Sequence, residues 1–140
     1  MLALSQSLEC QIVRLAADRG IVAVPAAVAP STFEALQTAV QPGRFGAITV
    51  PVWNGASTDT IWSGPKVNYL FRALHDVHHV ELGAGFDAAG EREASRYLWS
   101  MIRGRLERRT VWAETFGQVR HFLNSGQFPI QQRSFVEATR

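Results

Sequence analysis

The stretch Phe71-Arg72-Ala73-Leu74-His75-Asp76-Val77-His78-His79-Val80-Glu81 holds three of the four histidines of the chain. Apolar residues at positions 67, 70, 71 and 74 follow the spacing of one helix face, which predicts a helix from about residue 66 to residue 81. In that helix His75 and His79 are one turn apart and share a face. Two imidazoles at this spacing can bind one metal ion, and Asp76 follows the first of them. The stretch therefore predicts a helix that carries a metal site.

A metal site needs at least one further ligand. The sequence His75-Asp76-x-x-His79 has the spacing of the zinc-protease helix, but with Asp in place of the Glu that acts as general base there. Two acids further along the chain are candidates for the third ligand: Glu114, which we prefer, and Glu91. Either would complete a site of two histidines and one carboxylate, which leaves coordination positions open at Fe(II) or Zn(II). Such a site suits Fe(II) oxygenase chemistry or metal-dependent hydrolysis, with Asp76 and Glu91 as candidate catalytic groups.

Other polar residues could orient these ligands. They are His78 beside the pair, and Gln118 and His121 on the same helical stripe as Glu114. Two alternatives remain open. The histidines could form a purely structural hydrogen-bond network, since helix histidines often contact carbonyls or carboxylates. Asp76, His79, Glu91 and Glu114 could instead hold two metals in a helical bundle, although the paired Glu-x-x-His repeats typical of such sites are absent.

The length of 140 residues fits a single domain, residues 1–140, with a hydrophobic core. We expect it to be mainly α, with a small β element at about residues 45–53. Residues 1–62 would form N-terminal helices and this short strand, and residues 63–140 a helical core around the metal site. Helices are predicted at about 4–19, 32–40 (with Ser31 as N-cap), 66–81, 87–104, 106–123 and 129–138.

The charged and sulfur-containing residues add three expectations. Thirteen of the fourteen basic residues are arginines, and the densest run is Arg103, Arg105, Arg108 and Arg109. This run is either a solvated helix end or a contact for an anion, a partner protein or nucleic acid. A single cysteine, Cys10, excludes an internal disulfide, and its apolar helical context predicts a core position. With neither a signal-peptide pattern nor an apolar run of about 20 residues, we expect a cytoplasmic protein that does not bind membranes.

The order of motifs resembles an uncharacterised domain of phages and mobile elements, which occurs alone and inside large polyvalent phage proteins. The resemblance covers about residues 64 to 135 and rests on Phe71-Arg72-Ala73-Leu74-His75-Asp76, Phe86, Gly90-Glu91-x-x-Ala94, Met101 and Glu114-Thr115-x-Gly117-Gln118. It implies an origin in phages or mobile elements rather than a particular activity.

A shorter resemblance is to the iron site of the aromatic amino acid hydroxylases. The order of His75-Asp76-x-x-His79, the segment Phe86 to Glu91, and Glu114-Thr115-Phe116-Gly117 is similar to theirs. It implies that His75, His79 and Glu114 are iron ligands and that Glu91 is a supporting carboxylate.

These expectations lead to two functions. In the first, the chain is a small metal-binding protein of phage type with Fe(II) or Zn(II) as cofactor; as an enzyme it would act on an unknown small molecule. In the second, it is a non-catalytic accessory or anti-defence protein that binds a host protein, and its histidines are structural. An enzyme should carry the histidines at the floor of a cleft, whereas an inhibitor should enclose them.

Overall fold

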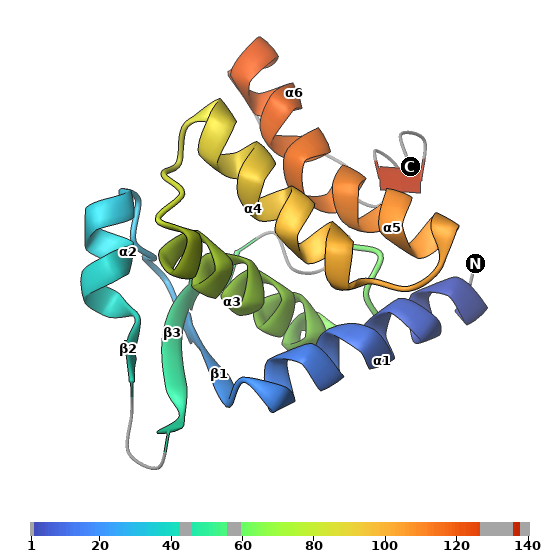
Figure 1. Cartoon of the computed structure of the whole chain (residues 1–140), viewed down its shortest axis with the longest axis horizontal. Coiled ribbons are helices and arrows are strands. Elements are labelled where there is room, and N and C mark those ends of the chain that lie inside the picture. Colours follow the sequence, from blue (N-terminus) through green and yellow to red (C-terminus); the bar gives the residue numbers. More distant parts are fainter. Residues whose placement is uncertain (1, 43–45, 56–59, 127–135, 138–140) are drawn as a thin grey trace.

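The computed structural model of the chain describes residues 2–42, 46–55, 60–126 and 136–137. It shows a mainly α domain with a small sheet, as the sequence predicts. The long helix α3 (Pro65–Leu82) contacts α1 (Leu2–Asp18), two strands of the sheet and α4 (Ala88–Met101). Figure 1 shows α3 in the middle of the molecule, between the sheet and α1 on one side and α4 on the other. The candidate metal site therefore lies on the central helix.

The sheet contains more of the chain than the predicted strand. The strand β3 (Ile48–Trp53) confirms the β element predicted at about residues 45–53. It lies between β1 (Ile21–Ala26), which runs parallel to it, and the two-residue strand β2 (Gln41–Pro42), which runs antiparallel. Because β2 pairs only with Ile48 and Thr49, Pro51 lies beyond the pairing on that side, where a missing N–H is tolerated.

The predicted central helix is confirmed. It begins at Pro65, a residue whose fixed φ suits the first helical turn, and ends where Gly83 adopts the left-handed conformation with φ 64°. The buried face carries Phe71, Leu74 and Val77, which pack into one core with side chains of the neighbouring helices and strands.

The C-terminal helices differ from prediction in one respect. The expected single helix at 106–123 is a continuous helical run, but it is divided into α5 (Arg105–Trp112), the π-helical turn η2 (Ala113–Gly117) and α6 (Gln118–Ser125). A π turn inserts one extra residue, which changes the direction of every side chain beyond it, and such turns are frequent at functional sites. Sequence periodicity cannot locate this insertion because apolar spacing tolerates a one-residue shift.

Smaller differences concern single residues. The helix α2 (Phe33–Ala39) is capped by Thr32, whose hydroxyl accepts from the Ala35 N–H, so the prediction of Ser31 as N-cap is wrong. Cys10 is exposed, which corrects its expected core position. Most of the helix predicted at 129–138 lies outside the described residues. Among the helices that are described, none combines the length and the apolar character needed to cross a bilayer.

Candidate metal centre

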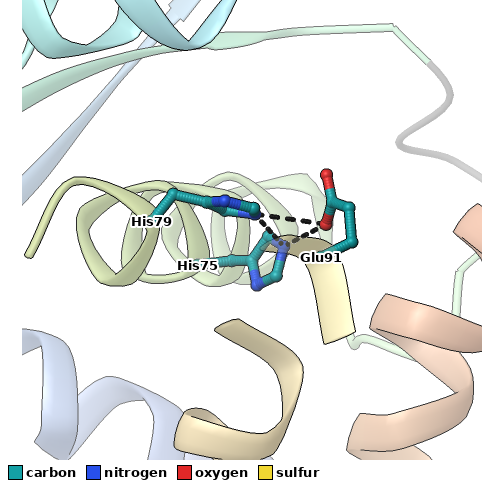
Figure 2. Close-up of side chains that lie close together, drawn as sticks. All are labelled: His75, His79 and Glu91. Atoms are coloured by element: carbon teal, nitrogen blue, oxygen red, sulfur yellow. Dashed lines mark hydrogen bonds and ion pairs between the residues drawn. The ribbon is translucent and has the colours of Figure 1, made fainter. Parts of the chain in front are cut away.

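Three ligand atoms converge between α3 and α4. The His75 Nε2 and His79 Nε2 atoms are 3.1 Å apart, and each is 3.1 Å from Oε2 of Glu91. Figure 2 shows both imidazoles projecting from α3 toward the carboxylate. These are the only three His, Cys, Asp or Glu side chains in the described part of the chain that come together in this way. They form the candidate metal centre.

The loop between α3 and α4 brings Glu91 to the histidines. Asp87 caps α4 by accepting the Gly90 N–H at 2.8 Å, and this fixes the first turn, to which Glu91 belongs. Gly90 is buried against the loop, and a Cβ atom there would lie 1.9 Å from the carbonyl oxygen of Gly85. Only glycine allows this close approach, which places the first turn of α4 beside α3.

The tautomer of His79 suits metal binding. Its Nδ1 lies 2.8 Å from the carbonyl oxygen of Ala84, which can only accept, so Nδ1 carries the hydrogen. In the neutral ring the Nε2 lone pair then faces Glu91 and His75. A backbone carbonyl that fixes a ligand histidine in this way is a common feature of metal sites. The Phe86 ring packs edge-on against His79 at 5.2 Å and holds the imidazole from another side.

The dimensions of this triangle suit a transition metal or zinc. An equilateral triangle with sides of 3.1 Å has its centre about 1.8 Å from each corner. This spacing allows all three atoms to bind one ion with bonds of about 2.1 Å. Three protein ligands would leave further coordination positions to a substrate or water.

The pKa values reflect this close contact. Burial disfavours the charged form of Glu91, but hydrogen bonds from His75 and His79 outweigh it and lower the pKa of Glu91 to about 2. Burial also disfavours the His79 imidazolium, yet the contacts with Glu91 and Ala84 raise the pKa of His79 above its usual value. Glu91 is thus a carboxylate that attracts positive charge to the space beside the two histidines. A divalent cation can supply this charge in place of a proton.

A cavity of about 280 Å³ adjoins the centre and is lined by His75 and Glu91, whereas His79 lies behind them and is 1% exposed in its side chain. Its apolar wall comes from Val52, Phe71 and neighbouring residues of β3, α3 and α6. Glu91, Glu114 and Asp76 all line this cavity, which is large enough for a small organic molecule.

Two further acids line this cavity. Burial raises the pKa of the Asp76 carboxyl to about 6, with His75 and His79 opposing the shift. Burial also raises the pKa of Glu114 to about 8, although the positive charge of Arg72 opposes it. Glu114 therefore carries a proton at neutral pH, and its Oε2 has no hydrogen-bond partner among the described residues. Acids with raised pKa values in a cleft are typical of functional sites.

The remaining site residues are divided between the cavity and other places. Glu114, our preferred third ligand, lies on the cavity wall but is not one of the three converging side chains; Glu91, the alternate, takes that place. Gln118 also lines the cavity. His78 points elsewhere: it is 1% exposed, and its ring packs edge-on against Tyr97 at 4.9 Å. His121 is partly buried and does not line the cavity.

Sequence reasoning did not predict two polar residues that α3 contributes to this site. Asn68 and Arg72 line the cavity together with His75, at positions i, i+4 and i+7 of α3. Arg72 donates to the carbonyl oxygens of Trp53 and Gly55 at 2.5 and 2.8 Å, which ties β3 to α3 at the cavity. A polar stripe at helical spacing, extended backward from His75, is the signal that could have revealed them.

Comparison with known proteins leaves the site as the main guide to function. The chain matches no protein-family model, and neither a curated protein nor a solved structure is significantly similar to it. Fold and site together define a mainly α domain with a candidate centre of two histidines and one glutamate.

Proposed function

We propose that this protein is a metal-dependent enzyme that acts on a small organic molecule in the cavity beside His75 and Glu91. The observation that carries the proposal is the convergence of three ligand atoms, each 3.1 Å from the other two, at the wall of that cavity. A structural hydrogen-bond network would have little need of an adjoining cavity lined by two further acids.

The roles of the residues follow from their positions. His75, His79 and Glu91 would hold one divalent ion, Fe(II) or Zn(II), which would supply Lewis-acid activation or oxygen chemistry. Asp76 lines the cavity next to His75 and would accept or deliver a proton. Glu114 is not a metal ligand in this proposal. As a protonated acid it would donate a hydrogen bond to the bound molecule.

The metal content of the purified protein tests whether the three residues bind an ion. Untagged protein, loaded anaerobically with Fe(II) or aerobically with Zn(II) and then desalted, is measured by inductively coupled plasma mass spectrometry. We expect about one ion per chain in the wild type and almost none in His75→Ala/His79→Ala, because two of the three ligands are lost. Glu114→Gln is the matched control and should retain its ion, since Glu114 lies outside the converging group.

Two results would contradict this proposal. A wild-type protein that binds neither ion at micromolar concentrations has no such centre. If Glu114→Gln lost the ion while Glu91→Gln kept it, the third ligand would be Glu114 and not Glu91. Once an ion is established, its identity directs the activity assays: oxygen consumption for the iron form and ester or amide hydrolysis for the zinc form.

A further inference from the structure

A second hollow lies at the junction of α4 and α5, away from the metal centre. It has a volume of about 460 Å³. It is lined by Trp99, Arg103, Gly104, Arg105, Arg108 and Arg109, which we call the arginine hollow. All four arginines of the dense basic run thus surround one concave space instead of spreading over a solvated helix end.

The backbone of the hollow is held from several sides. Gln11 of α1 bonds both polar backbone groups of Arg103: its Oε1 accepts the N–H at 2.7 Å, and its Nε2 donates to the carbonyl at 3.0 Å. Gly104 has φ 98°, a conformation that favours glycine, and turns the chain into α5. Ile102, which precedes Arg103, is fully buried. These contacts preorganise the turn that carries the arginines.

The side chains of Arg108 and Trp99 form one wall. The Arg108 Nε donates to the carbonyl of Ile102 at 2.6 Å, and its guanidinium stacks on the Trp99 ring at 4.7 Å. Trp99 nevertheless remains 38% exposed, so part of its ring faces solvent at the hollow. An exposed aromatic ring beside arginines is the arrangement on which nucleic-acid bases stack.

The charge of the hollow is unbalanced. None of its four arginines forms an ion pair with a carboxylate in the described part of the chain. One acid, Glu107, lies at the edge, against Gly104. Four guanidiniums around one space repel each other, and an anion would relieve this repulsion. The first turn of α5 has no side-chain cap and adds partial positive charge.

We propose that the arginine hollow binds nucleoside phosphates, with the arginines on the phosphate groups and Trp99 against the base. Planar guanidiniums bind phosphate oxygens in pairs, which a set of lysines would not do. The ligand is either a free nucleotide or a single strand of nucleic acid, since both present the same phosphate and base chemistry. This site is independent of the metal centre: Glu91 and Trp99 lie eight residues apart on α4, about 12 Å along the helix axis.

The test measures binding of two probes to the full-length protein. A fluorescein-labelled dT12 strand is followed by anisotropy, and adenosine diphosphate by isothermal titration calorimetry. Arg105→Gln/Arg109→Gln removes two exposed arginines of the hollow, and Arg92→Gln/Arg96→Gln on α4 is the matched control, exposed and equal in charge change. We expect the first variant to bind at least about tenfold more weakly and the control to bind within twofold of the wild type.

The salt dependence and Trp99 provide further readouts. For the single-stranded dT12 probe, loss of two phosphate contacts should lower the slope of log Kd against log salt concentration by about 1.4. Trp99→Leu should weaken both nucleoside-containing probes but leave inorganic phosphate binding unchanged. If the protein binds dT12 but not adenosine diphosphate, the ligand is a single strand. If it binds adenosine diphosphate as tightly as dT12, the ligand is a free nucleotide.

Three results would overturn the proposal: no binding of either probe by the wild type, equal weakening in the control variant, or displacement of both probes by millimolar inorganic phosphate together with no effect of Trp99→Leu. The last of these would indicate an adventitious ion only. Retention of the circular dichroism spectrum and of the metal ion by each variant excludes loss of fold as the cause.

Discussion

At the scale of single residues, the proton on Glu114 is a property that stability measurements can detect. The folded protein holds this proton up to a pH of about 8, because burial raises the pKa of Glu114, whereas the unfolded chain releases it near pH 4.5. The folded state therefore binds more protons between these limits, and the free energy of unfolding falls as the pH rises through this range.

Glu114→Gln should remove much of this loss. Urea unfolding of the metal-free wild type at pH 5 and pH 8 should show a decrease on the order of 2–4 kcal/mol. Asp76, whose pKa is raised to about 6, adds a smaller decrease, whereas the lowered pKa of His78 adds an opposing increase below about pH 6.5, so the variant should lose most of the net decrease. Glu93→Gln on the exposed face of α4 is the control and should behave as the wild type. An unchanged slope in Glu114→Gln would mean that Glu114 is ionised in the folded protein.

Two neighbouring histidines of α3 have opposite expected roles. His78 is buried against Tyr97, its Nδ1 has no partner among the described residues, and burial together with the charges of His75 and Arg19 lowers its pKa to about 3. It is a neutral core residue. His79 belongs to the candidate metal centre.

His78→Phe should therefore keep the metal ion and change the free energy of unfolding by no more than about 1 kcal/mol, because an aromatic ring of similar shape replaces an unsatisfied polar one. His79→Phe should lose the ion. Metal content and urea unfolding of both variants check this pair. Loss of the ion in His78→Phe would contradict the assignment of His78 to the core.

At the scale of elements, the α3–α4 connection decides which acid meets the histidines. Gly90→Ala should destabilise the protein by about 2 kcal/mol and weaken metal binding, because the added methyl group collides with the Gly85 carbonyl and moves the first turn of α4. Gly64→Ala is the control: its φ of −171° suits any residue and no described atom lies within 4 Å of the added Cβ.

Thermal unfolding and chelator competition measure the two effects of Gly90→Ala separately. Should the variant keep full stability and metal affinity, the close approach of α4 to the loop would not position Glu91.

The π turn η2 acts on the same cavity from another helix. Glu114 and Thr115 belong to this turn, and Gln118 follows it directly; all three line the cavity. The Thr115 hydroxyl donates to the Val111 carbonyl at 2.8 Å, which gives this carbonyl a partner within the widened turn. Glu114 and Gln118 are four residues apart and would share a face of a regular helix too, whereas His121, which lies beyond the turn, does not line the cavity.

At the scale of the whole molecule, the candidate metal centre lies between α3 and α4, so a bound ion should stabilise the fold as a unit. Binding to the folded state alone adds about 2.7 kcal/mol when the free ion is at a hundredfold excess over its Kd. For a domain of this length the Tm should rise by roughly 10 °C. Differential scanning calorimetry with and without Zn(II) measures this rise, and His75→Ala/His79→Ala should not show it. An equal rise in that variant would indicate binding elsewhere on the chain.

The sequence alone determined the features that depend on local periodicity. An α-helix repeats every 3.6 residues, so His75 and His79 share a face wherever their helix is placed. The mainly α class follows from the same spacing of apolar residues, and the β element from a run of β-favouring residues near residue 50. Gly83 and Asp87 could be read as helix boundaries because their conformations and hydrogen bonds involve only nearby backbone.

Only the tertiary structure decided which distant residues meet. The sequence offers both Glu91 and Glu114 as third ligands. The close packing at Gly90 brings Glu91 to the histidines as the third converging side chain. The π turn sends Glu114 to the cavity wall instead. The arginine run likewise becomes a hollow only through the turn at Gly104 and the contact of Gln11 with Arg103. Such contacts depend on packing between elements far apart in sequence, and no local pattern encodes the distance between them.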